Sequence, residues 1–116
     1  MKSTDLVRMA SESRAHDPTL RCVMVVEAGK MGEVACLLEG VEARDVVLAQ
    51  IEGGISPQAH LVVVPAGGHT TGLRIDLALI NVDPSEWADW LTTHVRSRLT
   101  RRAAFVDVSR LEEVRQ

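Results

Sequence analysis

The sequence predicts an α+β fold: a small two-layer sandwich with a mostly antiparallel sheet of about five strands and two helices. Three segments are rich in Val, Leu and Ile, as strands are: 19–27, 60–65 and 73–82. Residues 3–15 and 83–99 instead have apolar side chains at helical spacing. The length of 116 residues fits one domain, residues 1–116, with a single core.

The chain opens with a short amphipathic helix over residues 3–15. Ser3 or Thr4 is the expected N-cap, and Pro18 follows where the apolar pattern stops. Residues 19–27 come next and are apolar at almost every position. This pattern is typical of a central strand that is covered on both faces.

A glycine-containing turn follows this strand, at residues 28–32. With the segment Val-Val-Glu-Ala-Gly-Lys-Met-Gly around it, the turn resembles the strand–turn–helix opening of Rossmann dinucleotide-binding proteins, whose fingerprint is Gly-x-Gly-x-x-Gly. The second and third glycines correspond to Gly29 and Gly32, while Glu27 takes the place of the first. The resemblance implies a ligand-binding turn at Gly29, Lys30 and Gly32, with Glu27 placing a carboxylate near a bound diphosphate.

The next segments are less clear. Residues 32–40 fit either a short helix that ends at Gly40 or the return strand of a hairpin, and the hairpin would remove the dinucleotide interpretation. A strand is expected near residues 46–52. Two glycines and a proline make residues 53–58 a candidate mobile loop.

The segment 60–102 has the clearest local pattern. Residues 60–65 and 73–82 are predicted to pair as two strands joined by a loop with three glycines. The helix 83–99 should follow, with Asp83 as N-cap, Pro84 at the first helical position and Glu86 completing a capping box. A last strand is expected at residues 103–109, with Phe105 and Val106 on opposite faces of the sheet.

Composition limits the partners. The net charge is −3 and the chain has only three aromatic residues, which makes nucleic acid an unlikely ligand. The only candidate surface for it is a basic cluster at the end of the last predicted helix: Arg96, Arg98, Arg101 and Arg102. The charge of a helix dipole explains basic residues there without a ligand.

Location follows from the cysteines and the hydropathy. Cys22 and Cys36 are expected to be free, buried thiols of a cytoplasmic protein. No apolar run approaches the length of a membrane span, and the first residues do not resemble a secretion signal. We therefore expect no membrane association.

Catalytic chemistry has few candidates. His60, His69 and Asp76, with Asp83 beside them, combine imidazole and carboxylate groups that a metal or a general base requires. Their spacing matches no ligand signature. Asp76 also has a structural explanation, an ion pair with Arg74 or across strands. We expect no cofactor and no metal.

The apolar excess favours assembly. Continuously apolar strands leave more surface than one helical layer covers, so we expect a homo-oligomer or a protein partner, with Trp87, Trp90 and His94 at the interface. The order of elements is loosely similar to that of small phage neck and tail-completion proteins. The main hypothesis is a non-enzymatic assembly protein. The alternatives are a nucleotide- or small-molecule-binding domain that uses residues 28–32 and the His69 loop, and a small metal-dependent hydrolase at His60, His69 and Asp76.

Overall fold

The protein is described by a computed structural model, which defines residues 1–38, 46–48, 61–68, 70 and 73–110. Along the chain its elements are α1 (Ser3–His16), β1 (Cys22–Val26), η1 (Ala28–Lys30), α2 (Met31–Leu37), β2 (Val46–Leu48), β3 (Leu61–Pro65), β4 (Ile75–Ile80), α3 (Ala88–His94), η3 (Arg96–Arg98) and β5 (Leu99–Asp107). Here η denotes a 3-10 helix. The candidate loop 53–58 lies outside the described residues.

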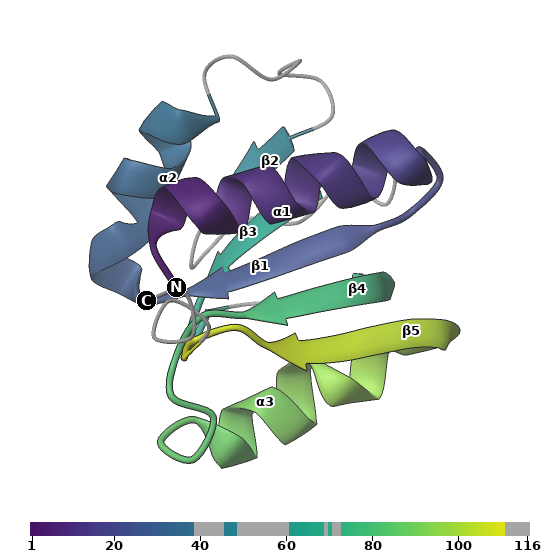
Figure 1. The fold of residues 1–116 in the computed structure, drawn as a ribbon. Coiled ribbons are helices and arrows are strands. Elements are labelled where there is room, and N and C mark those ends of the chain that lie inside the picture. Colours follow the sequence, from purple (N-terminus) through teal and green to yellow (C-terminus); the bar gives the residue numbers. More distant parts are fainter. Residues whose placement is uncertain (39–45, 49–60, 69, 71–72, 111–116) are drawn as a thin grey trace.

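The five strands form one sheet in the order β2-β3-β1-β4-β5 (Figure 1). Every neighbouring pair is parallel. The predicted antiparallel sheet is therefore wrong, and so is the hairpin of residues 60–65 with 73–82. β1 lies between β3 and β4, and because these two strands are parallel, the segment between them must cross from one end of the sheet to the other.

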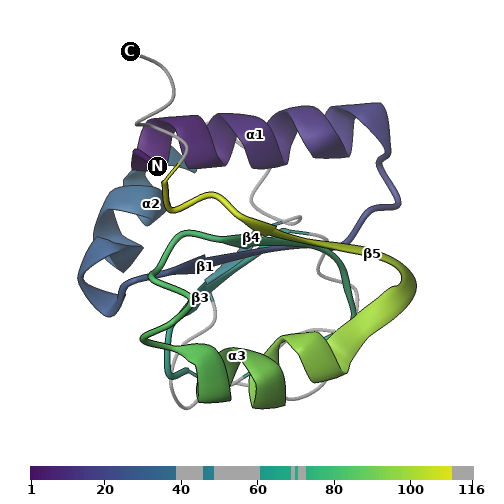
Figure 2. The same ribbon diagram turned by 60° about the horizontal axis from the view of Figure 1, so that its bottom comes forward.

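Helices cover both faces of the sheet, so the predicted two-layer sandwich with two helices is also wrong. Figure 2 shows α1 and α2 on one face and α3 on the other. Residues pointing to opposite faces alternate along β1, so that Met24 packs under α1 and α2 while Val25 packs on the side of α3. The continuous apolar runs are thus explained, since a parallel strand buried on both faces has no polar side.

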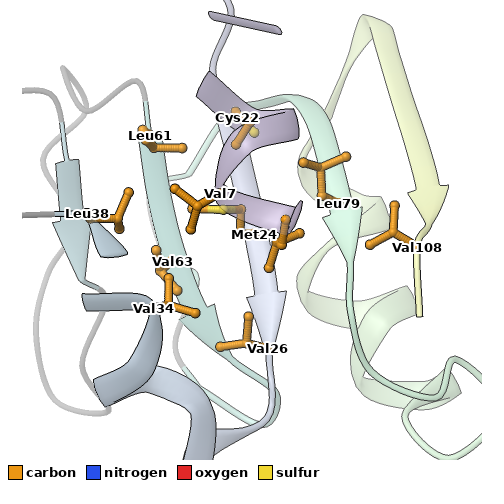
Figure 3. Close-up of a cluster of buried hydrophobic side chains, with 12 residues drawn as sticks. Val7, Cys22, Met24, Val26, Val34, Leu38, Leu61, Val63, Leu79 and Val108 are labelled. Atoms are coloured by element: carbon orange, nitrogen blue, oxygen red, sulfur yellow. The ribbon is translucent and has the colours of Figure 1, made fainter. Parts of the chain in front are cut away.

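Two cores result, one on each face. Figure 3 shows the core under α1 and α2, where aliphatic side chains of the sheet meet those of the helices. Its buried members are Leu6, Val7, Ala10, Cys22, Met24, Val26, Val34, Leu38, Leu61, Val63, Leu79 and Val108. The core under α3 contains Val23, Val25, Val62, Val64, Leu73, Ile75, Ala78, Ile80, Val82, Leu91 and Val95. Both are almost wholly aliphatic.

The first helix is confirmed, and Leu6, Val7 and Ala10 are its buried apolar residues. Its N-cap differs from the prediction. Lys2 is the residue that precedes the helix, and no side chain caps it. The hydroxyl of Ser3 instead donates to the carboxylate of Glu33, which ties α1 to α2.

The structure decides between the two alternatives for residues 32–40. After β1 the chain forms the 3-10 turn η1 and continues directly into α2. The hairpin is therefore excluded. Val34 is the buried residue of α2 and packs beneath α1.

The helix predicted at 83–99 is shorter than expected. Asp83 Oδ1 accepts hydrogen bonds from the amide (3.0 Å) and the hydroxyl (2.7 Å) of Ser85, so it closes a turn of its own. α3 begins only at Ala88 and has Trp87 as its N-cap. β5 consequently starts at Leu99, four residues before the predicted strand. Phe105 and Val106 do pack on opposite faces, as predicted.

The two tryptophans hold the crossover between β3 and β4 against α3. The indole nitrogen of Trp90 donates to the carbonyl of Gly68 at 3.2 Å. Gly67 has a φ of 88°, which favours glycine, and a Cβ added there would lie 3.4 Å from the ring of Trp87. The apolar side of α3 is thus occupied by the protein's own chain.

We predict opposite effects for two glycine-to-alanine changes. In Gly68→Ala the new Cβ would lie 2.9 Å from the carbonyl oxygen of Pro65, and the resulting overpacking should lower the free energy of unfolding by about 1–3 kcal/mol. Gly32→Ala is the control, because nothing lies within 4 Å of its Cβ position and helix propensity should raise stability by about 0.5 kcal/mol. Urea unfolding measures both. Equal stability of the two variants would contradict the packing of this crossover.

Candidate functional site

A crevice lies where the connections of two neighbouring strands diverge. β1 leads into α2 on one face of the sheet, whereas the adjacent β4 leads into α3 on the other face (Figure 2). In open parallel sheets, ligands bind outside the carboxyl ends of the strands at such a point. The N-terminal residues of α1 lie at this same end (Figure 1).

The crevice has a volume of about 690 Å³, within the range of small-molecule sites. Residues that follow three strands and those that begin α1 line it: Met1, Lys2, Ser3, Thr4, Glu27, Lys30, Glu33, Leu37, Asn81, Val82, Asp83, Ser109 and Arg110. Most of these are polar. The floor is set by the ends of β1, β4 and β5, so its shape depends on the sheet and not on one loop.

Asn81 connects the strands to the start of the chain. Its side-chain oxygen accepts a hydrogen bond from the amino group of Met1 at 3.1 Å, and its amide nitrogen donates to the Met1 carbonyl at 2.9 Å. The same amino group donates to the carbonyl of Ser109 at 3.0 Å. These bonds fix the wall of the crevice that lies between α1 and the ends of β4 and β5.

The charges of the crevice nearly balance. Its positive groups are the side chains of Lys2, Lys30 and Arg110 and the amino group of Met1, and its carboxylates are those of Glu27, Glu33 and Asp83. Lys30 lies 3.9 Å from Glu33. Hydrogen bonds from the side chain and amide of Ser85 lower the pKa of Asp83, which keeps it charged at neutral pH. The site therefore presents donors and acceptors without a large net charge.

The glycine turn lies at this end, but its glycines do not do what the Rossmann fingerprint requires. Neither Gly29 nor Gly32 has a positive φ, and neither is approached by other atoms within 4 Å of an added Cβ. The sheet also differs, because β3 lies beside β1, whereas Rossmann sheets place the second strand there. Ligand binding by Gly29, Lys30 and Gly32 stays a prediction. Of these three residues, Lys30 lines the crevice.

Asp76 lies at the opposite end of the sheet, at the start of β4, and is 6 % exposed. Its carboxylate accepts hydrogen bonds from the amide of Arg21 at 3.0 Å, the hydroxyl of Thr100 at 2.5 Å and the guanidinium of Arg102 at 3.2 Å. The ion pair is therefore with Arg102 of β5 and not with Arg74. Asp76 thus connects the strands β1, β4 and β5 at their amino ends.

These contacts keep Asp76 ionised. Burial by itself would raise its pKa, but the hydrogen bonds from Arg102, Thr100 and the Arg21 amide outweigh burial and lower the pKa to about 2. A carboxylate with this many fixed donors is a poor proton acceptor at neutral pH, so its role is structural and not catalytic. We call Asp76 with its three donors the clasp.

The proposed catalytic group is not assembled by the described residues. His60 and His69 lie outside them. Asp76 stands at the amino end of β4 and Asp83 lies beyond its carboxyl end, so the two carboxylates belong to different ends of the sheet. Within the described part of the chain, no three His, Cys, Asp or Glu side chains are grouped so that they could hold a metal ion.

The candidate interface residues contact one another. The rings of Trp87 and Trp90 meet edge to face at 6.2 Å between centroids, and His94 stacks on Trp90 at 5.7 Å. All three are half-buried. Both cysteines are free, as predicted; Cys22 is buried, which raises its pKa to about 12, whereas Cys36 is exposed and the prediction of its burial was wrong.

The basic cluster divides in the structure. The guanidinium of Arg96 lies over the ring of Phe105, 3.9 Å from its centroid. Arg98, Arg101 and Arg102 instead line a hollow at the amino ends of the strands, together with Arg21 and Arg74. The sequence analysis missed Arg21 and Arg74. They precede β1 and β4, and they lie near the other arginines only because these strands are parallel neighbours.

It also missed Asn81, Ser109 and Arg110. The signal was present, since each lies within three residues of the end of a strand, and such residues gather at one edge of a parallel sheet. That signal could be used only after the strands were known to be parallel.

Comparison with known proteins identifies no relative: no protein-family model, curated protein or solved structure matches the chain. Among the described residues, no helix has the length and apolar character needed to cross a bilayer.

Asp76→Asn should test the clasp. Because the pKa of Asp76 lies below that of an unfolded aspartate, its charge stabilises the fold above about pH 4, and on the order of 2 kcal/mol is lost as the pH falls toward 2. The variant should lose about 1–3 kcal/mol at pH 7 and show a smaller further loss below pH 4. Urea unfolding from pH 7 to pH 2 measures this. Asp89→Asn, at an exposed position of α3, is the control; if it matches Asp76→Asn, the clasp is not stabilising.

Proposed function

We propose that this protein binds a small polar molecule in the crevice at the carboxyl ends of β1, β4 and β5. One observation carries the proposal: a hollow of about 690 Å³ lies where the connections of β1 and β4 leave for opposite faces of the sheet. This is the default ligand position of an open parallel sheet. The proposal follows the small-molecule alternative of the sequence interpretation.

The lining selects the class of ligand. Three cationic side chains, the amino group of Met1 and three carboxylates line the same space, so a neutral or zwitterionic molecule with both donors and acceptors fits better than a polyphosphate. Glu27 in particular would repel a diphosphate placed over the β1–α2 turn. Free amino acids and nucleosides have the required size and polarity.

The protein is proposed to bind its ligand without transforming it. Asp83 is held ionised by Ser85, and Asn81 is engaged with Met1 through both ends of its amide group. Neither side chain is poised to exchange a proton at neutral pH.

A substitution that fills the crevice should abolish binding. Thr4 is an exposed residue of α1 that lines the crevice, so Thr4→Trp should occupy the space with little effect on folding. A ligand at about ten times its Kd stabilises a protein by about 1.4 kcal/mol, which raises Tm by several degrees in a domain of this size. Thermal unfolding with a panel of free amino acids and nucleosides should give such a shift in the wild type and none in Thr4→Trp.

The matched control is Thr92→Trp, which adds the same side chain at an exposed position of α3 on the other face of the sheet. It should keep the shift. Amide chemical shifts should also change at Lys30, Asn81 and Ser109 when the ligand is added. No stabilising compound in the panel, or stabilisation that survives Thr4→Trp, would refute the crevice as the site.

Self-association through Trp87, Trp90 and His94 stays a second prediction, with weaker support. The sheet faces that suggested it are covered by helices, but the three rings remain partly exposed on one side of α3. Sedimentation velocity over a wide concentration range should show a dimer that Trp90→Ala weakens more than Thr92→Ala does. A monomer at every concentration would rule out self-association.

A further inference from the structure

A second hollow lies at the amino ends of the strands, opposite the crevice. Its volume is about 870 Å³ and its lining includes five arginines: Arg21, Arg74, Arg98, Arg101 and Arg102. Asp76 is the only acidic residue among the lining residues. The lining of this hollow is therefore strongly positive although the whole chain has a net charge of −3, so the fold concentrates positive charge in the hollow.

An irregularity in the sheet builds this hollow. Ile75 pairs with Leu99 and Leu77 pairs with Ala104, so residues 100–103 of β5 lie opposite the single residue Asp76. The extra residues form a bulge that carries Arg101 and Arg102. Bulges of this kind redirect side chains and are common beside functional sites.

Two of the guanidinium groups are held in place. Arg98 donates from Nε to the hydroxyl of Thr70 at 3.0 Å, and Thr70 itself is 1 % exposed. Arg102 is held by Asp76 and, at 3.4 Å, by Asp17. A guanidinium fixed through one of its edges loses less conformational entropy when its remaining N–H groups bind a ligand.

The other three guanidinium groups are available. Among the described residues, the side chains of Arg21, Arg74 and Arg101 make no hydrogen bond and no ion pair. Like charges gathered in one hollow repel each other, and an anion that contacts several of them would relieve this repulsion. Arginine pairs with both carboxylate and phosphate through two parallel hydrogen bonds. A phosphate group carries more negative charge than a carboxylate, so phosphate is the anion that this excess of positive charge fits best.

We propose that the arginine hollow binds a compact ligand that carries two or more linked phosphate groups. A single phosphate would meet only part of the positive charge. A nucleic acid fits less well, because the charge is confined to one hollow and stacking platforms are lacking. All three aromatic residues have intramolecular contacts: Trp87 and Trp90 at the crossover and Phe105 beneath Arg96.

Isothermal titration calorimetry with inorganic tripolyphosphate tests the proposal, with sodium sulfate at equal ionic strength as the reference anion. The double variant Arg74→Gln/Arg101→Gln removes two exposed guanidinium groups that have no described partner, so it should fold normally. Loss of two charge-assisted contacts should raise the Kd by about tenfold or more. Binding should also weaken as salt is added.

The matched control is Lys30→Gln/Arg110→Gln, which removes two positive charges from the crevice at the other end of the sheet. It should change the Kd for tripolyphosphate by less than about twofold, since the hollow keeps its contacts. Equal weakening by both double variants would overturn the proposal, because it would show that only the total charge matters. This control also separates the hollow from the crevice, whose binding is tested by Thr4→Trp with uncharged or zwitterionic ligands.

Two further titrations identify the source of the phosphates. ATP binding at least as tightly as tripolyphosphate would support the proposal and show that a nucleoside is accepted, whereas much weaker ATP binding would support an inorganic polyphosphate. Binding of a single-stranded oligonucleotide without binding of tripolyphosphate would overturn the compact ligand in favour of a polymer. No heat with either phosphate ligand above that with sulfate would also overturn it.

Discussion

The central strand β1 runs parallel to both of its neighbours, and the rest of the molecule follows from that constraint. Parallel neighbours cannot be joined by tight turns, so every connection must return to the amino end of the sheet. The connections through α2 and α3 cover opposite faces. The central strands β1, β3 and β4 are therefore buried on both faces, and the candidate sites lie at the two ends of the sheet.

The crossover between β3 and β4 shows how a connection without a helix meets this requirement. Residues 66–74 alone join the two strands, and the described ones among them are held by side chains of α3 and η3. The Trp90 indole bonds Gly68, Arg98 bonds Thr70, and Gly67 adopts a left-handed conformation beside Trp87. Both tryptophans of this largely aliphatic protein thus contact a connection whose described residues form no helix.

The sequence could predict the positions of most elements but not their direction. The apolar run around Met24 indicated a central strand covered on both faces, and this is confirmed. Residues 61–65 and 75–80 are also apolar at nearly every position, and such runs favour a parallel sheet. The intervening glycines resembled a hairpin loop instead, and nothing local distinguishes a loop that turns back from one that crosses the sheet. The start of the last helix was also mispredicted, because Asp83 bonds Ser85 in a separate turn and α3 begins only at Ala88.

The functional residues were harder to predict than the elements, because their proximity depends on strand order. Glu27 and Asn81 are far apart in sequence, and only the pairing of β1 with β4 brings them to one crevice. The same pairing brings Arg21 and Arg74 together at the other end. Lys30 was identified because its turn has a recognisable local pattern, whereas a site formed by single residues from several strands has none.

Asp76 connects the architecture with the charge of the molecule. A buried carboxylate at the amino end of β4 needs donors from its neighbours, and it obtains them from β1, through the Arg21 amide, and from the bulge of β5. The bulge that supplies Thr100 and Arg102 also places Arg101 at the surface. Asp76 and Asp17 both pair with Arg102 and leave the other four guanidinium groups of the hollow without a carboxylate partner among the described residues. The interaction that closes this end of the sheet therefore leaves the hollow positive. The crevice at the opposite end has no such excess among its described residues, because three carboxylates nearly balance three cationic side chains and the amino group of Met1. The two ends of one sheet therefore differ in the ligands they can attract, for reasons that begin with strand pairing.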